Sequence, residues 1–285
     1  MIQIGIRLHD VNDKCESALQ TLEARAAKAR EEGFCCVHLA PQKVMKGVSF
    51  EGGAFTEGLA HYFRRVFAQN ELDVAVLGCY MNLATPDPEK LALFKERYYG
   101  SIRVAALAGM GMVGTETGAP NTAYKHDANT RTEEALQTFI RNLADVVACA
   151  EKYGVTVAIE PVWKHIVYDA DRAKRVIDSI ASPNLRVILD PVNLLGVENV
   201  DDRERVIGHA MEVLSDRIAM VHIKDFIREK DDLTSVAAGT GEMDYRALLK
   251  FLKAEKPYIQ ATLENTSNDN AVWSRELIAR LYAEA

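Results

Sequence analysis

The sequence has no long hydrophobic run and no excess of positive charge. No apolar stretch approaches the roughly 18 residues that a membrane-spanning helix needs. The opening segment Met-Ile-Gln-Ile-Gly-Ile is typical of a strand and not of a signal peptide. We therefore expect no membrane partner. The formal net charge of −7 argues against a nucleic-acid partner, because such partners are held largely by cationic contacts to phosphate.

Cysteine is also sparse, and its pattern excludes two kinds of site. The five cysteines are scattered and lack the Cys-x-x-Cys spacing of a zinc knuckle. Their odd number does not suit a disulfide framework. We expect reduced thiols and a cytoplasmic location. The cysteines are Cys15, Cys35, Cys36, Cys79 and Cys149.

The chain lacks linkers, repeats and low-complexity segments, so we predict one domain over residues 1–285. Its hydrophobic pattern alternates between strand and helix periods. The predicted strands cover residues 2–8, 34–40, 73–81, 111–115, 155–160, 186–190, 218–222 and 259–264. The predicted helices cover 16–32, 56–70, 86–108, 171–180, 200–214, 245–254 and 270–283, with one more from a capping box at Thr130 and Glu133 to Gly154. Eight strands and eight helices in strict alternation, without a long insert, predict an α/β fold. A single (β/α)8 TIM barrel suits this pattern better than a doubly wound sheet.

Four of these strands share one design. Each is an apolar run that ends in a side chain able to bind a metal, and the four side chains are Glu160, Asp190, His222 and Glu264. They follow one another about 30 to 42 residues apart, which is roughly one strand–helix unit. Because parallel strands end at the same edge of a barrel, we expect the four side chains to meet there.

Two glutamates, one aspartate and one histidine form an oxygen-rich ligand set with a single imidazole. This set predicts one divalent metal ion, with Mn²⁺, Mg²⁺ or Co²⁺ suited and Zn²⁺ possible, and it leaves coordination positions for substrate hydroxyls. An alternative is that each acid accepts N–H groups of the following helix. That alternative explains any one of the acids but not four matching positions.

The segments around these residues resemble one known family. The resemblance covers most of the chain and rests on Ala158-Ile-Glu160-Pro161, Leu189-Asp190-Pro-Val-Asn193, Val221-His222-Ile-Lys224-Asp225 and Leu263-Glu264-Asn265. The sequence is similar here to the xylose-isomerase-like barrels, which include sugar-phosphate isomerases and epimerases, ketohexose 3-epimerases and inosose dehydratases. The resemblance implies that Glu160, Asp190, His222 and Glu264 bind one metal ion, with Mn²⁺ expected first. It also implies that the two glutamates act as an acid/base pair on opposite sides of a sugar.

Two positions depart from the family pattern. Some members carry Asp-x-x-His where this chain has Asp190 and Asn193, and an amide cannot replace an imidazole ligand. A multi-zinc endonuclease site is therefore not expected. The epimerases also tend to have a second glutamate six residues after the first, where this chain has Ile166. Their way of gripping substrate is not reproduced, so the identity of the sugar stays open.

Further residues are candidates for binding substrate. Arg228 lies six residues after His222 and matches an arginine of the epimerase pattern, whereas Lys224 shares a strand face with His222. The remaining candidates lie at the ends of predicted strands or just beyond them. The full set is Arg228, Lys224, Glu116, Asn193, Trp163 and His38. The alternative for each is a structural polar group, a surface residue or, for Trp163, ordinary core packing.

We therefore expect an enzyme, a divalent-metal-dependent isomerase or epimerase of a sugar or sugar phosphate. It would work through an enediolate, with Glu160 and Glu264 moving the proton. The expected partner is a small carbohydrate or polyol, and a homo-oligomer is possible. Three alternatives stay open: an inosose-type dehydratase, a carbohydrate lyase subunit that needs a partner chain, and a sugar-binding barrel without catalysis.

Overall fold

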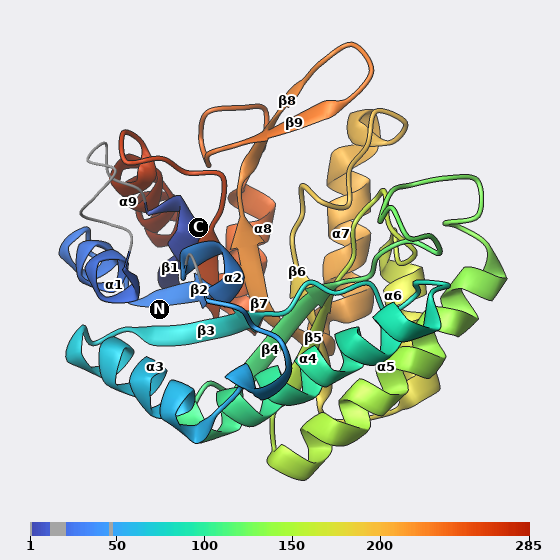
Figure 1. Ribbon diagram of the computed structural model, residues 1–285. Coiled ribbons are helices and arrows are strands. Elements are labelled where there is room, and N and C mark those ends of the chain that lie inside the picture. The colour runs from blue at the N-terminus through green and yellow to red at the C-terminus, as the bar shows by residue number, and fades with distance from the viewer. Residues whose placement is uncertain (1, 12–20, 46–47) are drawn as a thin grey trace.

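The chain folds into a closed barrel of parallel strands, as a computed structural model describes it for residues 2–11, 21–45 and 48–285 (Figure 1). The barrel order is β1-β10-β7-β6-β5-β4-β3-β2, and β1 closes the ring by pairing with both β2 and β10. The predicted single (β/α)8 TIM barrel is confirmed. Its strands are β1 (Gln3–Arg7), β2 (Cys36–Leu39), β3 (Asp73–Gly78), β4 (Met112–Glu116), β5 (Thr156–Glu160), β6 (Leu185–Leu189), β7 (Ile218–Ile223) and β10 (Gln260–Leu263).

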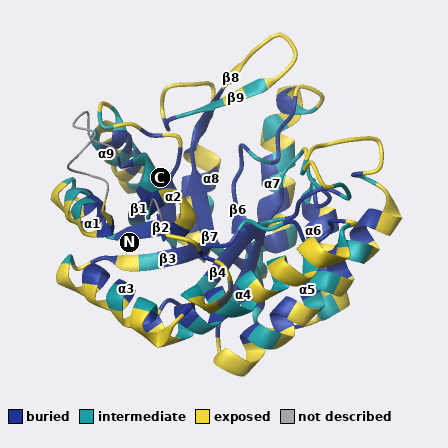
Figure 2. Cartoon of the chain, in the orientation of Figure 1, coloured by how far each residue is buried: buried dark blue, intermediate teal, exposed yellow. Residues whose placement is uncertain are grey.

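Helices surround the barrel and bury their inner faces against it, while their outer faces stay exposed (Figure 2). They are α1 (Leu22–Glu31), α3 (Glu57–Gln69), α4 (Pro88–Ala108), α5 (Glu133–Tyr153), α6 (Ala170–Ile180), α7 (Arg203–Leu214), α8 (Arg246–Glu255) and α9 (Ala271–Glu284). In the described part of the chain, 3-10 turns flank some of the strands and helices: η1 (Leu8–Asp10), η2 (Gly52–Ala54), η3 (Val200–Asp202) and η4 (Ser215–Arg217). Residues 16–20 of the first predicted helix lie outside the described residues. Among the described helices, none has the length and apolar character needed to cross a membrane.

The start of α5 differs from the prediction. Its N-cap is Thr132, whose hydroxyl accepts a hydrogen bond from the Ala135 N–H at 3.2 Å. Thr130 instead accepts from the Asp127 N–H at 2.9 Å, because the chain makes a separate turn there before the helix begins. The predicted capping box at Thr130 is therefore wrong. The helix ends as predicted, at Gly154 in the left-handed conformation.

Small residues lie in the barrel interior, where they pack closely against larger ones. Ala158, two residues before Glu160 and on the same strand face, packs with Val76 and Ile188 in the barrel interior. At Gly114 of β4, an added Cβ would come within 2.5 Å of Val76 and 2.8 Å of Ile188. The interior below the acids is therefore filled, and the open space lies above them.

Two short elements interrupt the predicted alternation. The helix α2 (Pro41–Val44) follows β2, and an antiparallel hairpin of β8 (Asp225–Arg228) and β9 (Leu233–Val236) follows β7. This hairpin extends beyond the barrel at the top of Figure 1. Buried Asp225 holds its base, because its carboxylate accepts hydrogen bonds from the N–H groups of Phe226, Gly239 and Met243 at 2.8, 3.0 and 2.8 Å. The sequence analysis predicted neither of these short elements, although the expectation of no long insert is unaffected by them.

Candidate active site

The four acidic and imidazole side chains predicted from strand ends meet at one end of the barrel. Glu160 is the last residue of β5, His222 lies in β7, and Asp190 and Glu264 directly follow β6 and β10. All four are buried, with exposed fractions of 5% or less. Because β5, β6, β7 and β10 are consecutive neighbours in the ring, the four side chains come from one continuous arc.

His222 is the centre of this group. Its Nδ1 lies 3.2 Å from Glu160 Oε1 and 3.5 Å from Glu264 Oε1. Ligand atoms of Glu160, Asp190 and His222 all lie within 4.8 Å of one another, and so do those of His38, His222 and Glu264. The His38 and His222 rings stack in parallel with centroids 5.2 Å apart.

The loop after β6 positions two of the acids. Asp190 Oδ1 accepts hydrogen bonds from the N–H groups of Val192 at 2.9 Å and Asn193 at 3.1 Å. The Asn193 side-chain amide donates to Glu160 Oε1 at 2.6 Å. Asn193 therefore orients Glu160 through the hydrogen bond from its amide. A histidine that bound a metal ion at this position would not have that role.

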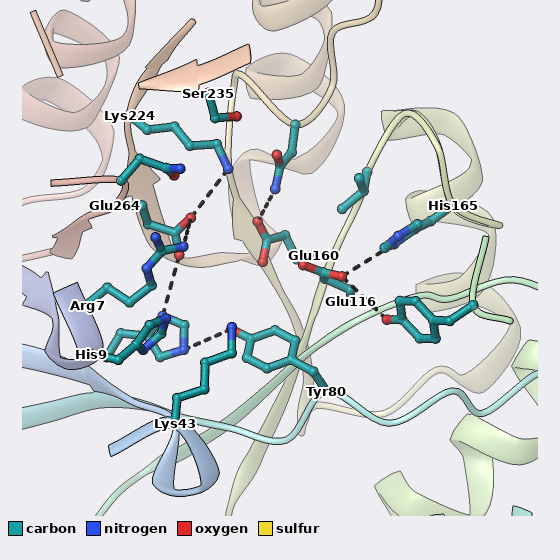
Figure 3. Close-up of a pocket in the computed structure, with 15 residues that line it drawn as sticks. Arg7, His9, Lys43, Tyr80, Glu116, Glu160, His165, Lys224, Ser235 and Glu264 are labelled. Carbon is teal, nitrogen blue, oxygen red and sulfur yellow. Dashed lines mark hydrogen bonds and ion pairs between the residues drawn. The ribbon is translucent and has the colours of Figure 1, made fainter. Parts of the chain in front are cut away.

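Two cations balance the acids. Lys224 Nζ lies 2.8 Å from Asp190 Oδ2 and 3.3 Å from Glu264 Oε2, and the lysine is almost fully buried. Arg7, at the end of β1, approaches Glu264 Oε2 to 3.3 Å (Figure 3). Arg7 also pairs with Asp10 at 3.0 Å. Each of these charges is thus matched by a carboxylate, as buried charges require.

The crowding of charges shifts the pKa values of the group. Burial is the largest influence on Glu264 and raises its pKa, yet His222 and Lys224 together hold that pKa well below its usual range. At Glu160, burial again raises the pKa, but the charge of His222 outweighs it, so the pKa of Glu160 is lowered. At Asp190 burial prevails over the charge of Lys224, so its pKa is raised. For His222, burial is outweighed by the carboxylates of Glu264 and Glu160, which raise its pKa to about 9.

The donor set fits a divalent cation. Carboxylate oxygens of two glutamates lie within 3.5 Å of one imidazole nitrogen, with a third carboxylate beside them. Such a cluster of acids needs positive charge at its centre, and oxygen-rich sets with one imidazole suit Mn²⁺, Mg²⁺, Co²⁺ or Zn²⁺. Glu160, Asp190, His222 and Glu264 are the residues that could hold this ion.

Two of these residues, Glu160 and Glu264, line a cavity of about 420 Å³. Of the residues predicted to bind substrate, Lys224, Glu116, Asn193 and His38 line it or lie against it. Glu116 Oε2 accepts a hydrogen bond from Tyr124 at 3.4 Å. Burial, followed by the charges of Glu160 and Glu264, raises the pKa of Glu116 to about 7.

The structure does not bring Arg228 and Trp163 to this cavity. Arg228 lies in the exposed half of β8 and pairs with Asp201 at 2.7 Å, because the hairpin carries this position out of the barrel. Trp163 donates from Nε1 to Glu198 at 3.0 Å and stacks under the guanidinium of Arg131 at 4.1 Å. It lines a separate surface depression of about 180 Å³.

Other lining residues were not among the candidates predicted from the sequence. Arg7 and Tyr80 lie at or just beyond the ends of β1 and β3, so the strand-end rule that found the acids could have found them as well. His9 and Lys43 lie in η1 and α2, which the hydrophobic pattern did not reveal. The acids therefore come from the ends of β4, β5, β6 and β10. Most of the basic lining residues come from β1, β2 and the short elements η1 and α2 that follow them.

The buried acids and the histidine lie at the carboxyl ends of the barrel strands, which is where the active sites of TIM-barrel enzymes lie. The sequence profile of the xylose isomerase-like TIM barrel family matches residues 26–283. The chain belongs to this family, whose members include sugar isomerases and epimerases.

Three relatives illustrate the likeness. A probable L-ribulose-5-phosphate 3-epimerase of Mycoplasma pneumoniae is 28% identical over 159 residues, which are 55% of this chain and 48% of that protein. The match thus spans about half the length of this relative. The crystal structure of a D-tagatose 3-epimerase-like protein has a TM-score of 0.74 at 18% identity and covers 99% of this chain and 97% of its own. The crystal structure of IolI with a bound zinc atom has a TM-score of 0.72 at 16% identity, and the match covers 99% of this chain and 98% of that chain. At these identities the two structures show a common fold alone.

Proposed function

We propose that the protein is a divalent-metal-dependent isomerase or epimerase that acts on a sugar or a sugar phosphate. One observation carries the proposal. Oxygens of Glu160 and Glu264 lie 3.2 and 3.5 Å from the same nitrogen of His222, at the floor of a cavity of about 420 Å³. A cavity of that size suits a small sugar. The name of the Mycoplasma pneumoniae relative supports the same substrate class.

The two glutamates supply the proton transfers. One carboxylate takes the proton from the carbon beside the substrate carbonyl, and the electrons of the broken C–H bond move to the carbonyl oxygen to give an enediolate. In epimerisation the other glutamate, after it has taken up a proton from solvent, returns a proton to the opposite face of that carbon. In isomerisation the proton returns at the neighbouring carbon, and the hydroxyl proton of the reacting carbon moves to the former carbonyl oxygen. The lowered pKa values of Glu160 and Glu264 favour the carboxylate form that the first step needs.

The surrounding residues hold this pair in place. Asn193 fixes Glu160 by its amide hydrogen bond, and Lys224 and Arg7 fix Glu264 through charge. A divalent cation bound by Glu160, Asp190, His222 and Glu264 supplies positive charge for the oxygens on which negative charge develops. Burial of the whole group excludes water and strengthens these interactions.

Solvent hydrogen exchange tests the proposal. Free and phosphorylated ketoses and inososes are incubated with the protein and Mn²⁺ in D₂O, and product is analysed by NMR and mass spectrometry. We expect one deuterium at the reacting carbon. Glu160→Gln and Glu264→Gln should each lose about 10²–10⁴-fold in turnover, because each removes an acid/base group.

Glu134→Gln, on the exposed side of α5, is the matched control and should turn over normally. The Mn²⁺ content of each variant is measured in parallel, so that loss of chemistry is separated from loss of metal. Turnover without label, full activity in either Gln variant at the cavity, or a product that has lost water would contradict the proposal.

A further inference from the structure

Among the described residues that line the cavity, one cationic side chain forms no ion pair with a carboxylate. Arg7, Lys43 and Lys224 line it, and the first and last of these form ion pairs with buried acids. Among the described residues, Lys43 forms no ion pair, and its contact is with the ring of Tyr80, whose centroid lies 6.0 Å from Nζ. Lys43 belongs to α2 at the rim, and its side chain rises beside Tyr80 into the cavity (Figure 3).

A second unmatched group lies on the same wall. His9 lines the cavity from η1, and its Nδ1 is buried without a hydrogen-bond partner among the residues that the structure describes. Burial lowers the pKa of His9 to about 3, and the charges of Arg7 and Lys43 act in the same direction. The imidazole is therefore neutral and lies in a positive potential.

The opposite wall has the reverse character. Glu116 lies there with Tyr124 and His165, which approach its Oε2 to 3.4 and 3.7 Å (Figure 3). The cavity is thus polarised, with basic groups from β1 and β2 on one side and an acid from β4 on the other. Hydroxyl groups of a neutral sugar would suit the acidic wall but would leave the charge of Lys43 without a counter-charge.

We propose that Arg7, His9 and Lys43 form a subsite for an anionic group of the substrate, a phosphate monoester or a carboxylate. The substrate is then an anionic sugar whose reacting carbon lies at Glu160 and Glu264. The sugar part of this statement rests on the function proposed above, whereas the anion subsite does not. Lys43 supplies the free positive charge, His9 a hydrogen-bond donor, and Arg7 a positive potential beside them.

Binding of inorganic phosphate tests the subsite without catalysis. Protein freed of metal by chelation and dialysis is titrated with phosphate by calorimetry at constant ionic strength. We expect Lys43→Gln to weaken phosphate binding about tenfold, or about 1.4 kcal/mol. Lys250→Gln, which removes an exposed charge from α8, is the matched control and should bind as the wild type does. Absence of phosphate binding, or equal losses in the two variants, would overturn the subsite.

Kinetics identify the source of the anionic group. With a phosphorylated ketose, a sugar acid and the neutral ketose as separate substrates, Lys43→Gln should raise KM about tenfold for the anionic substrate that the enzyme uses. It should leave kcat within about twofold, because Lys43 does not touch the reacting carbon. Preference for the neutral ketose, unchanged by Lys43→Gln, would overturn the anion subsite and leave the proposed chemistry standing. Selective loss of phosphate binding without turnover of any sugar would support the subsite and contradict the proposed chemistry.

Discussion

At the scale of single residues, Lys224 is the side chain whose positive charge balances the carboxylates of Asp190 and Glu264. Its ammonium lies 2.8 Å from Asp190 and 3.3 Å from Glu264, and the opposing carboxylates raise its pKa although burial lowers it. A charge held in this way offsets the repulsion between the acids in the protein without metal. It also repels a divalent cation that binds the same carboxylates.

We therefore expect Lys224→Met to act in two opposite directions. Without metal, its free energy of unfolding should fall by about 3–5 kcal/mol, because a buried carboxylate loses its partner. Its affinity for Mn²⁺ should rise, because a positive charge beside two ligands is gone. Urea denaturation and Mn²⁺ titration measure the two effects.

Lys164→Met provides the comparison. Lys164 pairs with Asp232 at 2.6 Å, but both side chains are more than half exposed, so the cost should be about 0–1 kcal/mol. If Lys224→Met were as stable as this control and bound Mn²⁺ no more tightly than the wild type, Lys224 would not balance the centre.

Several residues of the site could be predicted from the sequence and others could not. Glu160 and Glu264 were predictable because each ends an apolar run, and burial of a strand leaves a clear pattern. The pairing of Arg7 with Glu264 depends on β1 lying beside β10, which no local pattern reveals. Arg228 lies at the distance in sequence from His222 that the family pattern predicts. Sequence spacing does not reveal that the hairpin of β8 and β9 carries Arg228 away from the barrel.

The hairpin of β8 and β9 is the feature that matters most at the scale of elements. It contributes Ser235 to the cavity, and its base depends on Asp225. The fully buried carboxylate of Asp225 accepts three backbone hydrogen bonds. At Gly241, an added Cβ would come within 2.6 Å of this carboxylate and 2.1 Å of the Phe226 carbonyl oxygen.

Asp225→Ala should loosen the hairpin. We expect a loss of about 3 kcal/mol in the free energy of unfolding, because several buried N–H groups lose a charged acceptor. Amide hydrogen exchange should accelerate across residues 225–243. Asp244→Ala, which removes an exposed carboxylate paired with Arg246, should change neither quantity by a comparable amount. Unchanged exchange in Asp225→Ala would show that other contacts hold the hairpin.

Long elements were predictable from the sequence, whereas short ones were not. The helices α4 and α5 have 21 residues each, and each is followed by a glycine at its C-terminal end. The sequence pattern within each segment and the glycine after it both predict the helix. The strands β8 and β9 have four residues each and are partly exposed, so they lack the apolar run that marks a buried strand. The hairpin of β8 and β9 depends on hydrogen bonds from the N–H groups of Gly239 and Met243 to Asp225. These residues are 14 and 18 positions away from Asp225, so a local sequence pattern does not predict the contacts.

At the scale of the whole molecule, closure of the barrel creates the site. The alternating pattern predicts eight strand–helix units, but the pairing of Gln3 with Gln260 and of Ile6 with Leu263 is what makes them a ring. Closure brings the basic residues of β1 and β2 to face the acids of β4 to β10. A polarised cavity is thus a property of the ring and not of any one segment.

The proposed function requires one divalent cation bound by Glu160, Asp190, His222 and Glu264. Calorimetric titration of chelator-treated, dialysed protein with Mn²⁺ measures this directly, with His222→Ala as the comparison and circular dichroism as the check that the barrel remains folded. We expect one Mn²⁺ per wild-type chain, with a stabilisation of about 2.7 kcal/mol when free Mn²⁺ is about 100 times Kd. His222→Ala should stay folded and bind Mn²⁺ far more weakly. A wild-type protein that binds no Mn²⁺ and unfolds identically with and without it, or a His222→Ala variant that binds as tightly, would contradict the account.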